Sequence, residues 1–141
     1  MSKASLTEQL KNKILIMDGA MGTMLQRANL TEEDFGGEEY EGCNEYLNFT
    51  YPAVIESIHL EYLQAGADII ETNTFGATSL VLEEYDLADQ AYELNKRAAI
   101  LARNAVNQVA TSDWPRFVAG SMGPTTKTLS VTGGTTFEIL K

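Results

Sequence analysis

The sequence predicts an α/β protein built on a parallel sheet, and three observations lead to this prediction. Short apolar runs of strand length alternate along the 141 residues with longer segments of helical period. Each apolar run changes to small or polar residues where it ends, in ILIMDGA, DIIETNTFGA and RFVAGSMGP. One helical segment ends at a glycine that leads straight into an apolar run, as in the second half of a βαβ unit. Strands that alternate with helices in this way form a parallel sheet covered by helices.

The first elements are a short helix, a strand and a glycine turn. We expect the helix over residues 6–13 and the strand over 14–17, in the apolar run ILIM. The turn MDGAMGT follows at once, and we expect a second helix over 21–27. This order predicts that the turn joins the carboxyl end of a buried strand to the start of a helix.

Residues 28–50 lack a clear hydrophobic period. The segment is acidic and contains Gly36, Gly37 and Gly42. We therefore expect a long surface loop. Loops of this length are often functional covers or flexible segments.

The segment YPAVIESIHLEYLQAG predicts a helix over 51–66. Pro52 stands at an early helical position, where its missing N–H costs nothing, and Gly66 supplies the C-terminal stop. The apolar residues that share one face at helical spacing are Val54, Ile55, Ile58, Tyr62 and Leu63. A strand over 67–73 follows directly.

The remaining elements repeat the helix-to-strand order. We expect a short helix over 77–84 and a longer one over 86–109, followed by a strand over 116–121. The long helix carries one apolar stripe, formed by Leu87, Ala91, Leu94, Ala98, Leu101, Ala102 and Ala105. A glycine- and threonine-rich loop over 122–136 leads to FEILK, which reads as the opening of another helix.

Composition and charge exclude several classes of function. The formal net charge is −10, with an isoelectric point near 4.4, which is unsuited to a nucleic-acid partner because phosphates demand a basic face. No stretch approaches the roughly 18 apolar residues that span a bilayer. The N-terminus lacks an apolar signal core, so we expect a cytoplasmic protein. The single cysteine, Cys43, excludes an internal disulfide and any metal site made of several cysteines of this chain.

The polar turns at the strand ends are the candidate site, because α/β folds bind ligands at the carboxyl ends of parallel strands. In DGAMGT, glycines allow close approach of a ligand, and the following helix start offers free N–H groups suited to a carboxylate or phosphate. The GxxG spacing differs from the dinucleotide fingerprint. Alternatively, Asp18 is an ordinary helix cap. The spacing by itself leaves the two readings nearly balanced.

A second polar cluster follows the second strand. Glu71, Thr72, Asn73 and Thr74 could bind a polar small molecule, or they could cap the strand and its loop. SMGPTTK could shape the same rim. His59 lies in the middle of a helix, which favours a solvent-facing or packed histidine, and no nucleophile with a paired base can be assembled.

Three strands are too few for a barrel, which needs eight βα units and about 250 residues. We therefore expect residues 1–141 to be the N-terminal portion of a larger domain. An open sheet edge would then favour self-association. The alternative is a small complete α/β protein.

Four segments in the same order carry a resemblance to a known family. They are MDGAMGT, then NEYLNFTYPAVIESIHLEYLQAGADIIETNTFGAT, then ELNKRAAILARNAV, and finally FVAGSMGPT. Together they resemble the homocysteine-binding module of cobalamin-dependent methionine synthases, from about Ile14 to the end of the chain. Other homocysteine methyltransferases share the DGA turn and the strand-end pattern.

The resemblance implies a (β/α)8 TIM barrel, of which this chain would hold the first three to four βα units. It further implies that homocysteine binds at the strand ends and that a zinc ion held by cysteines carries its sulfur as thiolate. The thiolate attacks methylcobalamin to give methionine. Methyltetrahydrofolate-binding and cobalamin modules of the same polypeptide would be the partners.

Carried over by position, Asp18, Gly19, Ala20 and Met21 would form the amino-acid end of the homocysteine pocket, with Thr72, Asn73 and Thr74 on the same rim. The zinc cysteines of the family do not occur here, and Cys43 matches none of them, so we expect them beyond Lys141 and no catalysis by this chain alone. The alternatives are a betaine-, S-methylmethionine- or reductase-fused type of homocysteine methyltransferase, or a non-catalytic α/β binding domain.

Overall fold

The computed structural model describes residues 5–129 and 133–140, so residues 130–132 of the predicted loop and Lys141 of the last helix lie outside the described residues. The helices are α1 (Leu6–Asn12), α2 (Met21–Arg27), α3 (Glu32–Phe35), α4 (Leu47–Thr50), α5 (Pro52–Ala65), α6 (Ser79–Leu82), α7 (Ala91–Val109) and α8 (Phe137–Leu140). The strands are β1 (Ile69–Glu71) and β2 (Phe117–Ala119). Four 3-10 turns are η1 (Glu38–Tyr40), η2 (Asn44–Tyr46), η3 (Glu83–Tyr85) and η4 (Ala88–Gln90).

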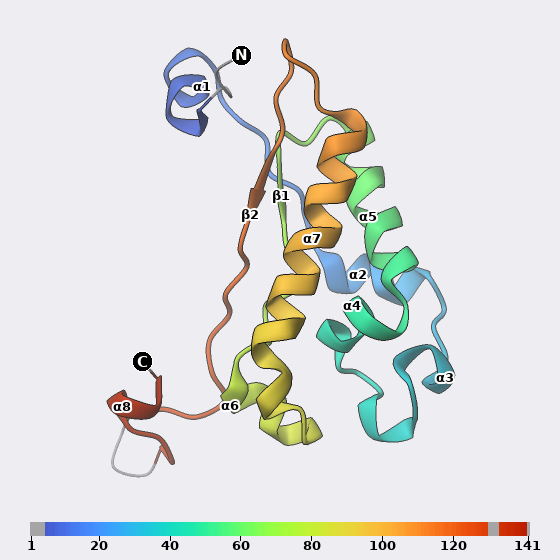
Figure 1. Cartoon of the computed structure of the whole chain (residues 1–141), viewed down its shortest axis with the longest axis vertical. Coiled ribbons are helices and arrows are strands. Elements are labelled where there is room, and N and C mark those ends of the chain that lie inside the picture. The colour runs from blue at the N-terminus through green and yellow to red at the C-terminus, as the bar shows by residue number, and fades with distance from the viewer. Residues whose placement is uncertain (1–4, 130–132, 141) are drawn as a thin grey trace.

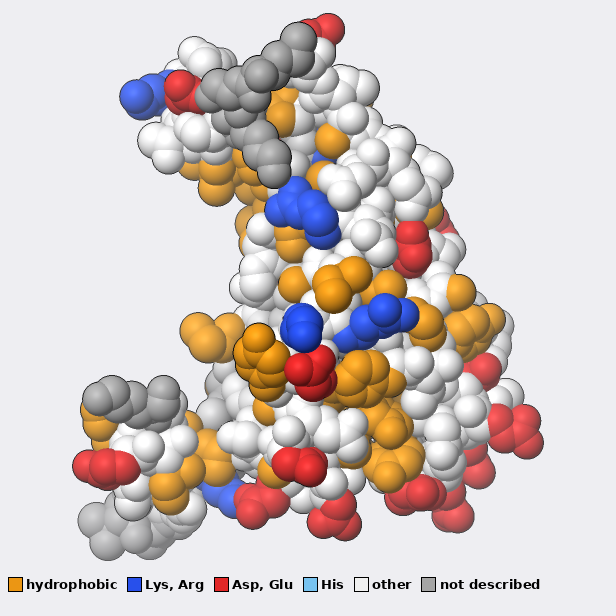
Figure 2. Space-filling model, in the orientation of Figure 1, with side chains coloured by type: hydrophobic (Ala, Val, Ile, Leu, Met, Phe, Trp, Pro, Cys, Tyr) orange, Lys and Arg blue, Asp and Glu red, His pale blue; other side chains and the backbone are white. Residues whose placement is uncertain are grey.

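The two strands form a parallel sheet, as predicted, with Ile70 opposite Val118. The helices α5 and α7 pack side by side along one face of this sheet (Figure 1). Ile70 is fully buried against residues of both helices, among them Leu63 and Ala102. The opposite face is not covered by any helix among the described residues, and the molecule is hollowed beside β2, between α1 and α8 (Figures 1 and 2).

The predicted helix over 51–66 is confirmed as α5 with both of its end signals. Pro52 occupies the first turn, and Gly66 ends the helix with φ +112°, in the left-handed region that favours glycine. The residues after Gly66 turn directly into β1. This tight connection brings the carboxyl end of β1 to the end of the molecule that holds α2 and α6 (Figure 1).

The predicted buried strand over 14–17 is wrong in part. Met17 makes only an isolated parallel bridge to Ile69, although the backbone of Ile16 also accepts from Asp68 and Ile69. Ile14 is 86% exposed and Ile16 56%. The segment therefore lies beside β1 as the sequence suggested, but the side chains of Ile14 and Ile16 are not covered by a neighbouring element among the described residues.

The segment over 28–50 is not the open surface loop that its lack of periodicity predicted. It folds into α3, η1, η2 and α4, which are too short to show a hydrophobic period. Phe35, Cys43, Leu47 and Asn48 are buried. The segment is therefore a packed wall of the molecule beside the strand ends.

The two helices predicted after β1 have different boundaries. The first is reduced to α6 with η3, and the second begins at Ala91 rather than at residue 86. Asp86 has φ +56°, which ends η3, and Leu87 turns into the core before the helix starts.

Across the described parts of the chain, helices of a length and apolarity suited to crossing a membrane are absent.

Candidate functional site

The turn after the first apolar run is fixed by the backbone of β1. The Asp18 N–H donates to the Ile69 carbonyl at 2.9 Å, and both Asp18 carboxylate oxygens accept from the Glu71 N–H at 3.1 and 3.2 Å. The N-cap of α2 is Ala20, and no side chain caps this helix. The capping interpretation of Asp18 is therefore wrong, because its carboxylate binds the strand instead.

Gly19 lies close to Tyr62, and a side chain at position 19 would be crowded by it. A Cβ atom there would lie 3.3 Å from the Tyr62 hydroxyl oxygen and 3.5 Å from the Tyr62 ring. The same hydroxyl donates to the Ala20 carbonyl at 3.3 Å. Tyr62 on α5 therefore supports the turn. A larger residue at position 19 would shift either the Tyr62 side chain or the turn itself.

The Asp18 carboxyl group is poised between its two protonation states near neutral pH. The pKa of Asp18 is raised to about 6, chiefly by burial; the hydrogen bond from the Glu71 N–H opposes this change and the charge of the Glu71 carboxylate adds to it. Perturbed carboxyl groups in clefts are common at functional sites. A bound cation beside Asp18 would favour its charged form.

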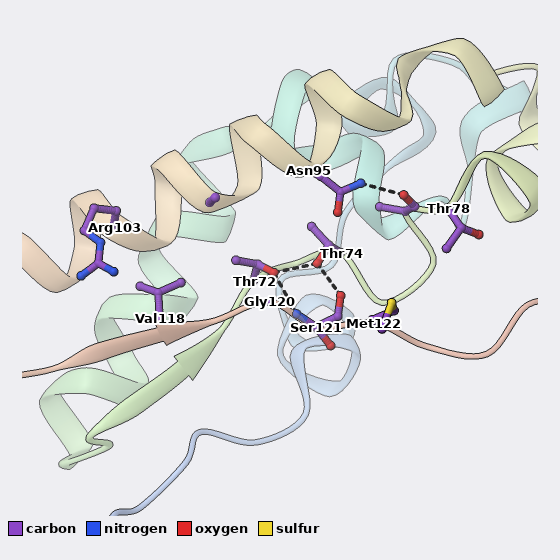
Figure 3. A pocket seen from close by; sticks show the side chains of 11 residues that line it. Thr72, Thr74, Thr78, Asn95, Arg103, Val118, Gly120, Ser121 and Met122 are labelled. Atoms are coloured by element: carbon purple, nitrogen blue, oxygen red, sulfur yellow. Dashed lines mark hydrogen bonds between the residues drawn. The ribbon is translucent and has the colours of Figure 1, made fainter. Parts of the chain in front are cut away.

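The hydroxyl groups of Thr72 and Thr74 link the loop after β1 to the end of β2. The two oxygens lie 2.6 Å apart, and Thr74 Oγ1 donates to the Ser121 carbonyl at 2.7 Å. The Ser121 N–H in turn donates to Thr72 Oγ1 at 3.1 Å. Figure 3 shows these bonds between the two strand ends. Both hydroxyl groups are thus committed to holding the loop.

The side-chain amide of Asn73 is committed as well. Asn73 Nδ2 donates to the Asn44 carbonyl at 2.7 Å and approaches Asn48 Oδ1 at 3.5 Å. Asn73 is 5% exposed. The structure therefore ties the loop after β1 to the segment Asn44–Asn48, which lies far away in the sequence.

One cavity of about 420 Å³ collects all seven residues that the sequence singled out as substrate-binding. Its walls are formed by Asp18, Gly19, Ala20, Met21, Gly22, Asn44, Glu45, Glu71, Thr72, Asn73, Thr74, Phe75 and Ser121. Three of these residues carry carboxylates and none carries a cationic side chain. The cavity therefore suits a small polar molecule with an ammonium group.

The sequence did not predict Asn44 and Glu45 as members of the site. They belong to a segment whose turns are too short to show a period, so nothing in the sequence placed them at the strand ends. Cys43 directly before them and Leu47 two residues after Glu45 are apolar and buried. These apolar residues on either side of Asn44 and Glu45 were the only indication in the sequence that the segment packs against the rest of the molecule.

A second cavity, of about 680 Å³, lies on the helix side of the sheet (Figure 3). The exposed face of α7 lines it with Asn95, Ala99 and Arg103, β2 contributes Val118, and Gly120 follows directly after β2. It shares Thr72, Thr74 and Ser121 with the first cavity. No carboxylate lines it, so its chemistry differs from that of the first cavity.

Neither Cys43 nor His59 lines the two cavities described above. Cys43 packs with Leu82, Leu87 and Leu94, and burial raises the pKa of its thiol to about 11. His59 is fully buried on α5, and both of its ring nitrogens lack a hydrogen-bond partner. The part of the chain that the structure describes contains no group of three or more His, Cys, Asp or Glu side chains that could hold a metal ion.

Acidic side chains gather at the end of the molecule that holds α3 and α6, and several lysine and arginine side chains lie over α7 (Figure 2). The carboxyl ends of β1 and β2 face the acidic end (Figure 1). The field around the first cavity is therefore negative, which raises the local concentration of cationic groups.

Comparison with known proteins places these features in one family. The family model described as homocysteine S-methyltransferase matches residues 15–141. Methionine synthase from Mycobacterium leprae is 47% identical over 136 residues, and methionine synthase from Mycobacterium tuberculosis is 45% identical over the same length. The match covers 96% of this chain but only 11% of either relative.

Solved structures agree with the family match. The homocysteine methyltransferase MmuM from Escherichia coli, in its oxidized form, superimposes with a TM-score of 0.70 at 28% identity, over 84% of this chain and 40% of that chain. Its metallated form gives a TM-score of 0.69 at 27% identity, over 84% of this chain and 41% of that chain. The predicted resemblance is confirmed: the chain belongs to the homocysteine S-methyltransferase family.

Proposed function

We propose that this chain forms the amino-acid end of the homocysteine pocket in a methyltransferase of the methionine synthase type. One observation carries the proposal. Two segments about fifty residues apart, Asp18–Met21 and Thr72–Thr74, line a single cavity of about 420 Å³ at the strand ends. These are the residues that the family resemblance assigns to substrate.

The two charged groups of homocysteine find different partners in this cavity. Its ammonium group is placed beside Asp18, Glu45 and Glu71, whose carboxylates line the wall. Its carboxylate is placed at the backbone N–H groups that follow Gly19, where no side chain caps α2. The ammonium group is then neutralised by the carboxylates, and the carboxylate group by the positive end of the α2 helix dipole.

We propose that residues 1–141 are the N-terminal portion of a (β/α)8 barrel and contain its first three to four βα units. Two findings support this: among the described residues, helices cover one face only of the parallel pair of strands, and MmuM is similar over 40% of its own chain. Barrel closure would bury the uncovered face. Without closure, the apolar side chains there, such as Ile16, favour self-association.

The residues of this chain do not fit a zinc site. The only thiol, Cys43, lies in an apolar cluster, and its raised pKa disfavours the thiolate that zinc requires. We therefore assign zinc, as well as methylcobalamin and the methyltetrahydrofolate and cobalamin modules, to parts of the polypeptide outside these 141 residues. The chain by itself is proposed to be inactive, and its cytoplasmic location stays a prediction.

The choice of methyl donor rests on the degree of similarity. Identity to the two methionine synthases is 47% and 45%, against 28% and 27% for MmuM. This difference supports the cobalamin-dependent type. Incubating the whole protein with L-homocysteine and either methylcobalamin or S-methylmethionine separates the two types, and we expect methionine only from the first.

Calorimetric titration of the zinc-loaded whole protein with L-homocysteine tests the proposed pocket. The Gly19→Val substitution places its side chain against Tyr62 at the cavity floor, so we expect a loss of at least about tenfold in affinity. Gly120→Val is the matched control, because Gly120 lines only the second cavity. Equal weakening by both variants, or no saturable binding by the wild type, would contradict the proposal.

A further inference from the structure

The wall of the homocysteine cavity formed by residues 72–76 is held from two sides. On one side, Thr72 and Thr74 bond to Ser121 at the end of β2. On the other side, the wall contacts the segment Asn44–Asn48, which comprises η2 and the start of α4. The first set of bonds is expected wherever neighbouring strands end together. The second set comes from a distant segment and needs an explanation.

Asn48 bridges the two segments with its side-chain amide. Its exposed fraction is 0%, and Asn48 Nδ2 donates to the Asn73 carbonyl at 2.8 Å and to the Glu45 carbonyl at 2.7 Å. Asn48 Oδ1 lies 3.5 Å from Asn73 Nδ2. The amide of Asn48 thus links two segments of the chain, and loss of its bond to Asn73 would leave a buried carbonyl unpaired.

Glu45 makes the second link, one turn earlier. Its Oε1 atom accepts from the Gly76 N–H at 2.7 Å. A Cβ atom on Gly76 would lie only 3.0 Å from the same oxygen, so glycine allows the close approach. Glu45 lines the cavity, whereas Asn48 lies behind the wall. The two residues therefore act on the loop at its middle and at its far end.

We propose that Asn48 and Glu45 are positioning residues that hold residues 72–76 in the conformation that binds the amino-acid part of homocysteine. This inference rests on the proposed function of the cavity. The side chains of Thr72, Asn73 and Thr74 already bond to other parts of the protein, so the loop contributes its shape to the pocket. That shape depends on the contacts from Asn44–Asn48.

Two measurements on the whole protein test this proposal: hydrogen–deuterium exchange of the amides from Asn73 to Ala77, and the steady-state constants for L-homocysteine. For Asn48→Ala and Glu45→Ala we expect faster exchange in this segment. We also expect KM for L-homocysteine to rise about tenfold while kcat at saturation stays within about twofold. Such a wall binds the substrate equally in the ground state and in the transition state, so disturbing it weakens binding and leaves the chemical step unchanged. Glu45→Gln keeps the acceptor oxygen for the Gly76 N–H and should restore the wild-type exchange, whereas its KM should stay raised because the carboxylate charge beside the ammonium group is lost.

The control is Asn104→Ala, an exposed asparagine of α7 outside the cavity, which should leave both readouts unchanged. If Asn48→Ala fails to fold, comparison of the exchange rates of Glu45→Ala and Glu45→Gln decides. Wild-type exchange in Glu45→Ala would overturn the proposal, and so would faster exchange with an unchanged KM. A wild type that does not respond to L-homocysteine would refute the proposed function instead, and the exchange data would still decide whether these residues hold the wall.

Discussion

Asp18 is the residue on which the chemistry of the cavity depends most directly. Its carboxylate is half-buried and bonded to the Glu71 N–H, and burial raises its pKa to about 6. Only the ionised form attracts an ammonium group. The charge of this one side chain therefore changes within the pH range in which the protein would work.

Binding of L-homocysteine should weaken as the pH is lowered from 7 to 5, because Asp18 takes up a proton through its pKa of about 6. We expect a decrease in affinity approaching about tenfold per pH unit below that value. In Asp18→Asn, binding should be weaker at pH 7 and should lose this titration. Calorimetry across the pH range measures both effects.

The exposed Asp89 of η4 offers the matched control. Asp89→Asn removes the same charge outside the cavity, so it should reproduce the wild-type pH profile. An Asp18→Asn profile that still falls between pH 7 and 5 would show that another group controls binding.

His59 makes a different prediction, for stability. Burial lowers its pKa to about 4, and its ring nitrogens have no partner. The unfolded chain, with a histidine pKa near 6.5, then binds more protons than the folded one between pH 6.5 and 4, so stability falls as the pH is lowered through this range. The expected loss is about 3 kcal/mol.

Urea unfolding of the wild type and of His59→Leu at several pH values isolates this contribution, because all other titrating groups are shared. The leucine variant should be at least as stable at pH 7, since it removes two buried polar atoms without partners. Its stability advantage should grow toward pH 4. A constant difference between the two proteins would contradict the buried neutral histidine.

At the scale of elements, the amino end of β1 is anchored by a cluster of polar contacts opposite to the cavity. Asp68, 4% exposed, accepts from Lys13 Nζ at 2.8 Å, from Trp114 Nε1 at 2.8 Å and from the Ile16 N–H at 3.0 Å. Arg116 stacks on the Trp114 ring and donates to the Leu63 and Ala67 carbonyls at the end of α5. This cluster joins the first segment, β1, β2 and α5.

Asp68→Asn should lower the free energy of unfolding at pH 7 by about 2 kcal/mol. Desolvation raises the pKa of Asp68, but the bonds from Lys13, Ile16 and Trp114 outweigh it and lower the pKa to about 2. The stabilisation is therefore complete above about pH 4 and is lost as the pH falls toward 2. Urea unfolding at pH 7 and pH 3 measures it.

The pair Lys96–Glu93 provides the control for this prediction. Both side chains are more than half exposed and lie 3.5 Å apart, so Glu93→Gln should change stability by no more than about 0.5 kcal/mol. Equal losses for the two substitutions would show that burial of Asp68 adds nothing.

Much of the fold could be predicted because strong local signals mark it. The apolar stripe with Pro52 and Gly66 fixed α5, and the change from apolar to polar residues located both strand ends. The segment over 28–50 could not be predicted in the same way, since its turns are shorter than one hydrophobic period. For that reason Asp18 and Asn73 were identified as site residues, whereas Glu45 and Asn48 were not.

At the scale of the whole molecule, helices cover only one face of the sheet in the part of the chain that the structure describes, and the first cavity lies where both strands end. The chain spans 40% of the MmuM chain and 11% of the methionine synthases that it matches. We infer that the amino-acid end of the substrate pocket is built here, and that the sulfur end is built by other parts of the polypeptide.

A crystal structure of the whole protein with L-homocysteine tests this division most directly. We predict that the ammonium and carboxylate groups lie in the first cavity, between Asp18–Met21 and Thr72–Phe75, with the sulfur pointing away from this chain's residues. Homocysteine bound instead in the cavity lined by Asn95 and Arg103, or with its sulfur against Asp18, would contradict it.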